Sequence, residues 1–306
     1  MRFTVRAPAS SANLGPGFDA IGLALDLWNE VTVDTEGEAN AVLNEGAEAA
    51  LLAGRENLTL RAMRTLAEEH GRFLPPFAVT TRTEIPIARG LGSSAAALVA
   101  GLVAANHLLD LGLTDDELYA VAWRIEGHGD NVGAAIYGGA ILAVPNVRRS
   151  VRLWAGEPLG LTAVVFIPEA TGATWAARAA LPAQIPHADA TFNVATAAGL
   201  TLGLRLRDHE LIAAGMHDRL HEPYRARLFP HLDAMRTAAL HAGALGACLS
   251  GAGPTVLALV PPDHAAAVGA AFMATAQRLQ THGRARELQP TIHGVSGPPP
   301  ETSVRI

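Results

Sequence analysis

A glycine-rich segment that leads directly into a long uncharged helix constrains the fold of this chain more than any other feature. Residues 86–97 read Pro-Ile-Ala-Arg-Gly-Leu-Gly-Ser-Ser-Ala-Ala-Ala, and the alanine-rich helix that they open is predicted to run to about Leu111. The glycines permit tight turns, so that backbone N–H groups can point into one cavity. The first helical turn adds unpaired amides and a partial positive charge. The segment therefore predicts an anion site suited to phosphates, although a ligand-free turn with serine caps explains it equally well on local grounds.

The chain contains no lysine, so all 23 of its basic residues are arginines. A Walker-A loop needs a lysine after its glycines, and a protein kinase needs one on a strand. A Schiff base needs a lysine amine. These three kinds of chemistry are excluded, whereas a cradle of backbone amides is not.

Charge and composition exclude a nucleic-acid partner. The formal net charge is −6, and no block of basic residues is present to neutralise a phosphate backbone. Aromatic residues make up only 5% of the chain, too few for a base-stacking platform. With 49% apolar and 17% charged residues, the composition is typical of a core-rich globular protein, and 306 residues suggest about two domains.

Three local features predict where the protein resides. Residues 90–109 carry no charge, but they are rich in alanine and glycine, which favours a buried helix and no membrane partner. The single cysteine, Cys248, lies in an apolar run, so we expect it to be buried and unreactive. Residues 1–11 lack the apolar stretch of a signal peptide, which predicts a cytoplasmic protein.

Apolar periodicity predicts strands alternating with helices. Strands are expected at residues 3–7, 20–33, 77–85, 161–167, 247–250 and 255–260, and helices at 57–70, 114–125, 173–180, 192–204, 211–217, 232–242 and 263–279. Thr114 and Glu117 carry the signature of a capping box. The run 132–144 is interpreted as strand-like around a Gly138-Gly139 break, and the tail from His293 as loose.

The pattern resets near residues 145–160, which predicts domains at residues 1–155 and 156–306. Each is expected to be an α+β unit.

Two more segments are rich in turn residues. Residues 8–19 read Pro-Ala-Ser-Ser-Ala-Asn-Leu-Gly-Pro-Gly-Phe-Asp, and residues 249–255 read Leu-Ser-Gly-Ala-Gly-Pro-Thr. Taken alone, turn chemistry accounts for both.

Together, however, the three segments resemble the three motifs of the GHMP kinases in order and in spacing. The match spans residues 8–254, and the combination is far more specific than any one motif. The resemblance implies a two-domain α+β fold, with an N-terminal ATP-binding domain that is ribosomal-protein-S5-domain-2-like and a C-terminal domain that is ferredoxin-like. It also implies ATP and Mg²⁺ as cofactors.

Within this superfamily the chain is most similar to the homoserine kinases. The similarity lies in residues 9–19, in Glu-Gly-His-Gly-Asp-Asn-Val at 126–132, in Thr-Trp-Ala-Ala-Arg-Ala-Ala-Leu-Pro at 174–182 and in Glu-Pro-Tyr-Arg at 222–225. It implies transfer of the γ-phosphoryl group of ATP to L-homoserine, a step of threonine biosynthesis. The chain departs from the family at Gly129, where a larger residue is expected, and at 133–135, which read Gly-Ala-Ala instead of Ala-Pro-Ala. Both departures bear on loop rigidity more than on chemistry.

The resemblance also implies a nucleotide site. The ATP phosphates would lie against the glycine loop and the start of its helix, and Asn57 with Leu58 would lie near the adenine. The loop residues concerned are Pro86, Ile87, Ala88, Arg89, Gly90, Leu91, Gly92, Ser93, Ser94, Ala95 and Ala96. Ser94 and Glu126 are implied as Mg²⁺ ligands, and a hard cation that keeps several waters suits such a pair.

An α-amino acid acceptor needs an anion for its ammonium group and a fork of donors for its carboxylate. Asp19 and Asp130 are candidates for the ammonium or hydroxyl end, and Arg178 and Arg225 for the carboxylate, because guanidinium binds carboxylates bidentately. The predicted pocket is completed by Asn13, His128 and Gly253.

The sequence offers no clear general base. Asn131 stands where mevalonate-type relatives have an aspartate, and an amide cannot accept a proton. The resemblance implies catalysis by transition-state stabilisation without a dedicated base. We expect Asn131 to position the hydroxyl while the phosphate carries the proton away, with Asp130 as the alternative base and Arg178 as a further catalytic residue.

Two other functions stay open. One is another GHMP small-molecule kinase, such as a mevalonate-pathway kinase, whose acceptor has no α-ammonium group. The other is a non-catalytic nucleotide-binding protein on the same fold, against which the presence of Ser94, Glu126, Asp130 and both arginines argues. The resemblance leaves a homodimer open.

Overall fold

Alternating burial along the first part of the chain builds a long antiparallel hairpin. In the computed structural model, which describes residues 1–39 and 41–298, β1 (Arg2–Asn13) pairs with β2 (Gly17–Asp34). The turn between them takes left-handed backbone at Asn13, Leu14 and Gly15 (φ 71°, 47° and 88°). The other strands of this sheet are β3 (Val42–Glu45), β4 (Ala78–Thr83), β5 (Ala140–Val144) and β6 (Arg149–Trp154). Within the described residues the order is β3-β4-β2-β5-β6, with β1 also paired to β2.

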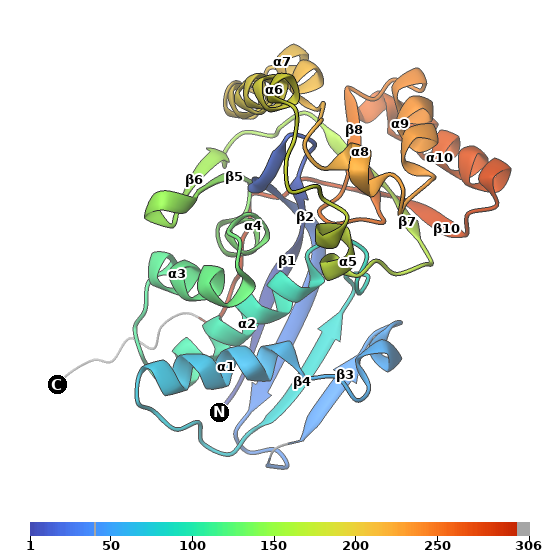
Figure 1. Ribbon diagram of the computed structural model, residues 1–306. Coiled ribbons are helices and arrows are strands. Elements are labelled where there is room, and N and C mark those ends of the chain that lie inside the picture. Colours follow the sequence, from blue (N-terminus) through green and yellow to red (C-terminus); the bar gives the residue numbers. More distant parts are fainter. Residues whose placement is uncertain (40, 299–306) are drawn as a thin grey trace.

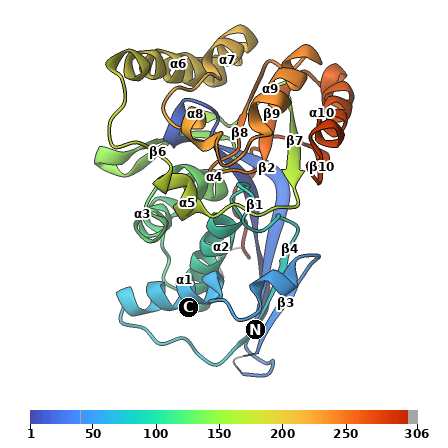
Figure 2. The same ribbon diagram turned by 45° about the vertical axis from the view of Figure 1, so that its right-hand side comes forward.

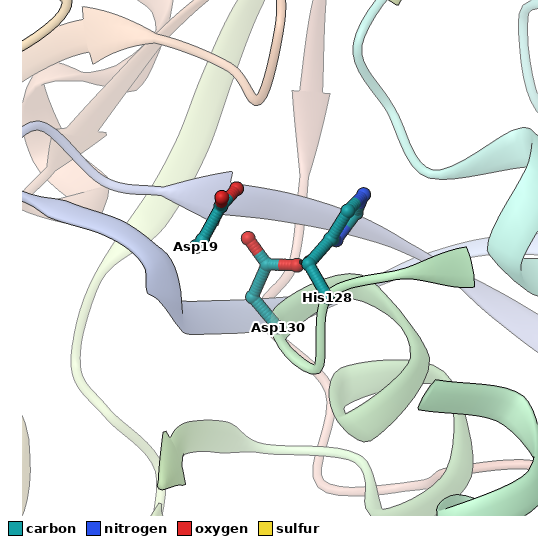
Figure 3. Close-up of side chains that lie close together, drawn as sticks. All are labelled: Asp19, His128 and Asp130. Carbon is teal, nitrogen blue, oxygen red and sulfur yellow. Dashed lines mark hydrogen bonds and ion pairs between the residues drawn. The ribbon is translucent and has the colours of Figure 1, made fainter. Parts of the chain in front are cut away.

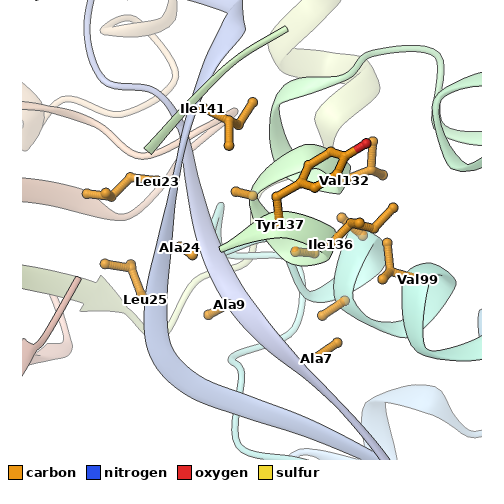
Figure 4. Packing of buried hydrophobic residues seen from close by; sticks show 14 of the residues in the cluster. Ala7, Ala9, Leu23, Ala24, Leu25, Val99, Val132, Ile136, Tyr137 and Ile141 are labelled. Carbon is orange, nitrogen blue, oxygen red and sulfur yellow. The ribbon is translucent and has the colours of Figure 1, made fainter. Parts of the chain in front are cut away.

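Helices cover the face of this sheet on which β1 and β2 carry small residues. They are α1 (Leu58–Glu69), α2 (Ser93–Leu108), α3 (Asp115–Glu126) and α4 (Asp130–Tyr137). Both α2 and α4 pack directly on β1 and β2, while α1 and α3 pack against α2 (Figure 1). Figure 4 shows the large side chains of α2 and α4, such as Val99 and Ile136, on the side of the hairpin where the strands carry Ala7 and Ala9. Alanines here let the helices approach the sheet closely.

The second sheet is antiparallel and has the order β10-β7-β9-β8 among the described residues. Its strands are β7 (Thr162–Pro168), β8 (Gly246–Leu249), β9 (Val256–Val260) and β10 (Gly283–Leu288). The helices of this half are α5 (Thr174–Ala179), α6 (His187–Leu206), α7 (His209–Gly215), α8 (Glu222–Arg225), α9 (Leu232–His241) and α10 (Ala265–Leu279). Because α9 precedes β8 and α10 precedes β10, the strands and these two helices have the split βαβ connectivity of ferredoxin-like folds, as expected.

The larger of two apolar clusters contains residues from both halves of the chain. Along β9, Val256, Ala258 and Val260 face α9 and α10, whereas Leu257 and Leu259 belong to the same buried cluster as the first sheet. Side chains alternate between the two faces of a strand, so β9 contributes to both cores. Figure 2 shows the second sheet standing beside the end of the β1–β2 hairpin. The glycine loop before α2 lies at this junction.

Most predicted elements are confirmed, including α1, α2, β4, β7 and α10. The capping box at the start of α3 is present, because the Thr114 and Glu117 side chains each accept from the other's backbone N–H. The buried character of α2 and of Cys248 is also confirmed. No helix in the described ranges is long and apolar enough to cross a membrane.

Two local expectations are wrong. Residues 130–137 form the helix α4, and only the part after Gly138-Gly139 is a strand; a short apolar run cannot by itself distinguish a buried helix from a buried strand. The described part of the tail is not loose either. Ser296 exchanges backbone hydrogen bonds with Arg6, and the Val295 N–H donates to the Ala135 carbonyl at 2.7 Å, so the chain returns to the first sheet and α4. Residues 299–306 lie outside the described part, and the division at residues 155 and 156 stays a prediction.

Candidate active site

The three glycine-containing segments meet at the junction of the two sheets. The Ser250 hydroxyl lies 2.8 Å from the Ser11 hydroxyl and donates to the Gly90 carbonyl at 2.7 Å. The Gly251 N–H donates to the Ala12 carbonyl at 3.0 Å. These bonds join the β1 end, the glycine loop and the β8–β9 loop around a cavity of about 620 Å³. Its lining includes the predicted residues Asn13, Asp19, Ile87, Ala88, Arg89, Gly90, Gly92, Ser93, Ser94, Glu126, His128, Asp130, Asn131, Arg178, Arg225 and Gly253.

The glycine loop offers unpaired amides to this cavity. Gly90 and Gly92 have φ of 80° and 71°, a conformation that favours glycine. Within residues 1–39 and 41–298, the N–H groups of residues 90–95 find no backbone or side-chain acceptor. The loop opens α2, whose N-terminal dipole adds partial positive charge. The geometry is therefore that of an anion cradle and not of a closed turn.

Oxygen ligands for a hard cation lie beside the cradle. The Ser94 hydroxyl, in the first turn of α2, donates to the Glu126 carboxylate at 3.0 Å, and Glu126 is the last residue of α3. One hydroxyl and one carboxylate, with water completing the shell, fit the preference of Mg²⁺. These two residues therefore fit the ion that the resemblance implies.

Near this pair, beyond the His128 ring that lies 3.9 Å from Glu126, Asp130 is a buried carboxylate with one oxygen unpaired. Its side chain is 0% exposed, and its Oδ1 contacts His128 Nδ1 at 2.6 Å and accepts the Asn131 N–H at 2.7 Å. Its Oδ2 has no partner among the described residues. Figure 3 shows the carboxylates of Asp19 and Asp130 pointing toward each other, with His128 alongside; one ligand atom from each lies within 4.8 Å of the others. A buried polar atom normally has a partner, so this group is suited to a cationic ligand.

The acidic group affects the protonation of His128. Burial works against a charged imidazole, but the hydrogen bond and charge of Asp130, with Glu126 and Asp19 nearby, raise the pKa of His128 above its usual value. The ring therefore favours the protonated form more than a free histidine does.

Two arginines face this group from the second half of the chain. Arg178, on α5, forms a fork on Asp19 with distances of 2.9 and 2.8 Å, and this hydrogen bonding raises the pKa of Arg178. Arg225, at the end of α8, is only 2% exposed but still lines the cavity. The sheet junction thus brings both predicted guanidinium groups to one pocket.

Local packing explains how α4 presents Asp130. A Cβ atom at Gly22 would overlap the Asp130 carbonyl, so the glycine in β2 is what lets the first turn of α4 rest on the strand. The Ser10 hydroxyl of β1 donates to the Asn131 side-chain oxygen at 2.9 Å. Asn131 therefore has its carbonyl oxygen held and its amide NH₂ available.

Family comparisons agree with this geometry. Residues 57–139 match the model of the GHMP kinases N terminal domain, and residues 200–276 match that of the GHMP kinases C terminal domain. The homoserine kinase of Moorella thermoacetica is 39% identical over 95% of this chain and 98% of its own length. The crystal structure of a homoserine kinase from Cytophaga hutchinsonii has a TM-score of 0.85 and 29% identity, covering 97% of each chain.

The chain belongs to the homoserine kinase family of the GHMP kinases. A mevalonate kinase from L. major, solved with R-mevalonate, superposes with a TM-score of 0.70 over 93% of this chain and 95% of its own, but at 19% identity it shares the fold alone.

Some residues assigned to the nucleotide site of this homoserine kinase family member lie elsewhere. Leu91, Ala95 and Ala96 are fully buried in the core, and the buried Pro86 does not line the cavity. Their role is to shape the loop, because none of them lines the cavity. The Asn57 side chain accepts from the Leu60 N–H as the cap of α1, so Leu58 and not Asn57 lines the cavity.

Two other polar side chains of the site are already occupied by the protein. The Arg89 guanidinium donates to the carbonyls of Pro168 and Glu169 and to the Glu48 carboxylate, each at 2.8 Å. The Asn13 side chain donates to the Gly251 carbonyl and accepts the Asp19 N–H. Both line the cavity but act as cross-links between loops.

The structure adds cavity residues that sequence reasoning missed. Asn29 on β2 and Thr81 on β4 are 2% and 5% exposed, and each has a polar side-chain atom without a partner among the described residues. Polar side chains in buried strands were the available signal. Trp175 on α5 lines the rim although it is 77% exposed.

Gly90→Ala should strongly weaken the binding of ATP. A Cβ would overlap the Ser250 carbonyl oxygen, and the φ of 80° disfavours alanine by about 1–2 kcal/mol. We expect the Kd for ATP, measured by calorimetry, to rise at least ~10-fold, about 1.4 kcal/mol. The matched control is Gly199→Ala on α6, where the added Cβ meets nothing within 4 Å. It should keep ATP affinity and gain about 0.5–1 kcal/mol of stability; equal ATP affinities in both variants would contradict the cradle.

A buried carboxyl behind the site should make stability depend on pH. Burial raises the pKa of Glu222 to about 7, although the Leu249 N–H, at 2.5 Å, and Arg236 both donate to its carboxylate. Because the folded-state pKa exceeds the unfolded value, stability should fall as pH rises from about 4.5 to about 7, by up to about 3 kcal/mol. Urea unfolding across this range should show a flatter profile for Glu222→Gln than for the wild type. The control Glu210→Gln, at an exposed site, should keep the wild-type slope, and an unchanged slope in Glu222→Gln would contradict the assignment.

Proposed function

We propose that the chain phosphorylates the side-chain hydroxyl of L-homoserine with ATP and releases O-phospho-L-homoserine and ADP. The observation that carries the proposal is a single cavity whose lining includes an amide cradle and, close to it, paired anionic and cationic groups. The cradle suits a polyphosphate. The opposed charges of Asp130 and Arg225 suit a zwitterion, which is what distinguishes homoserine from mevalonate.

The nucleotide would lie with its phosphates on residues 90–94. Its base would point toward Leu58, Asn29 and Thr81. The unpaired polar atoms of Asn29 and Thr81 would then meet the ring nitrogens of the base. Ser94 and Glu126 would hold Mg²⁺, which when bound neutralises phosphate charge. The chain's own part is to fix the phosphates with backbone amides that need no reorganisation.

The acceptor would bind between α4 and α5. Its carboxylate would meet Arg178 and Arg225, and its ammonium group the acidic group formed by Asp19 and Asp130. Arg178 must then leave Asp19 or share it, because the present fork occupies the guanidinium. The acceptor carries one charge of each sign, so its carboxylate would replace Asp19 as the partner of Arg178 and its ammonium group would replace Arg178 as the partner of Asp19.

The chemistry of the Asn131 side chain limits how the proton of the acceptor hydroxyl can leave. Its amide cannot accept a proton, and its oxygen already accepts from Ser10. We therefore assign Asn131 the positioning of the acceptor hydroxyl, with the proton leaving on the transferred phosphoryl group. The enzyme would serve threonine biosynthesis in the cytoplasm; a homodimer stays a prediction.

An ADP-release assay with a panel of acceptors tests the function. We expect L-homoserine to give a kcat/KM at least ~100-fold above those of mevalonate, which lacks the ammonium group, and galactose, which lacks both charges, because an acceptor lacking one charge leaves a buried partner unpaired, at about 2.7 kcal/mol for that factor. ATP consumption with mevalonate and none with homoserine would select the mevalonate-type alternative. Nucleotide binding without turnover of any acceptor would select the non-catalytic one.

Asp130→Asn distinguishes a binding role from that of a base. We expect the Kd for homoserine to rise, since the variant removes a negative charge near the ammonium group, and kcat to fall by less than about 100-fold, the lower end of what a general base contributes. Stopped turnover with unchanged homoserine affinity would identify Asp130 as the base instead. Asp233→Asn, whose side chain on α9 is 75% exposed, serves as the control and should match the wild type.

A further inference from the structure

Arg225 is a buried cation that has no anionic partner. It is 2% exposed, and within the described ranges no carboxylate lies within ion-pair distance of it. Burial, together with the nearby Arg178 charge, lowers the pKa of Arg225. A buried charge is normally paired. Since Arg225 lines the cavity, the missing anion is supplied by a ligand.

Three neutral acceptors hold the guanidinium instead. Its Nε donates to the Ala177 carbonyl of α5 and its NH1 to the Gly251 carbonyl of the β8–β9 loop, each at 3.1 Å. The third acceptor is His221 Nδ1, 3.2 Å from the same NH1. None of the hydrogen bonds within residues 1–39 and 41–298 involves NH2. That nitrogen is left for the ligand.

The tautomer of His221 follows from its second contact. His221 is 0% exposed, and its Nε2 lies 2.8 Å from the Gly15 carbonyl, which can only accept. Nε2 therefore carries the hydrogen, and Nδ1 presents its lone pair to Arg225. Burial lowers the pKa of His221 to about 4, the Arg225 charge acting in the same direction and Asp218 against it. The ring is neutral near pH 7.

The neutrality of this acceptor matters for binding. An aspartate or glutamate at position 221 would hold Arg225 equally well but would cancel its charge and weaken its attraction for an anion. A neutral imidazole fixes the guanidinium without adding a negative charge in direct contact with it. The Phe18 ring, 5.1 Å from the His221 ring and 5.2 Å from the Arg225 Cζ, packs against both and restricts their planes.

We propose that His221 is a positioning residue for recognition of the acceptor's carboxylate: it links the β1–β2 turn to Arg225 and aims the free NH2 of that guanidinium into the cavity. This inference rests on the proposed function, because the carboxylate is that of the amino-acid acceptor.

Two substitutions of His221 separate this role from a structural one. In His221→Asn the amide oxygen can take the place of Nδ1, whereas the donor to Gly15 is lost. In His221→Gln the amide nitrogen can take the place of Nε2, whereas the acceptor for Arg225 is lost. We expect His221→Gln to raise the KM for homoserine about 10-fold, because a hydrogen bond to a charged group is removed. Its KM for ATP should not change, and its kcat should stay within about 3-fold.

The reverse pattern is expected for His221→Asn. It should lower the melting temperature, through the unpaired Gly15 carbonyl, and keep the KM for homoserine within about 3-fold of the wild type. If instead the variant with the lower melting temperature also has the higher KM for homoserine, His221 has only a structural role and the proposal is wrong.

A substrate without the carboxylate charge provides the second readout. With L-homoserine methyl ester, which lacks that charge, His221→Gln and the wild type should have kcat/KM values within about 2-fold of each other. A 10-fold difference that persists with the ester would overturn the proposal even if both variants fold. A wild type that turns over no homoserine would overturn the proposed function itself, and the positioning role with it; an active wild type matched by His221→Gln would overturn the positioning role alone.

Discussion

Backbone amides without acceptors at the start of α2 are the constraint on which this structure depends. A protein that lacks lysine has no flexible ammonium group to follow a phosphate. The positive potential must come from dipoles fixed by the fold, and these act only if the loop stays open. The Ser250 hydroxyl on the Gly90 carbonyl and the Arg89 guanidinium on the carbonyls of Pro168 and Glu169 hold it open from outside. The arginine thus supports the loop, and in the proposed nucleotide site the positive charge is that of the main chain.

The rigidity of the junction explains why opposite halves of the chain can share one pocket. Leu257 and Leu259 of β9 enter the core of the first sheet, and the last described residues return to β1 and β2. An apolar interface of this kind opposes relative motion of the two units. Asp130 from one half and Arg225 from the other therefore line one cavity in a defined arrangement, as the proposed recognition of a small zwitterion requires.

Much of the architecture could be read from local patterns. The capping box at Thr114 and the helix after the glycine loop follow from nearest-neighbour chemistry, so they were predictable, whereas Asn57 was expected near the adenine and instead caps α1. The helix α4 was not predictable, because Gly133, Ala134 and Ala135 suit a buried helix and a buried strand alike. The strand β10 was not predicted, because it has too few apolar residues. It carries the exposed charged residues Arg284 and Glu287, so its sequence lacks the apolar pattern of a strand, and pairing with β7 holds it in place.

The sequence by itself determined which chemical groups are present: a glycine loop without lysine, the serine and glutamate suited to Mg²⁺, and two arginines in recognisable motifs. Only the tertiary structure decided which of them remain available. It occupies Arg89 and Asn13 with loop carbonyls, buries Ala95 and Ala96, and leaves the amides of residues 90–95, Asp130 Oδ2 and Arg225 NH2 without partners. The physical reason is that hydrogen-bond satisfaction is a property of neighbours in space, and many of those neighbours come from segments more than a hundred residues apart in the chain.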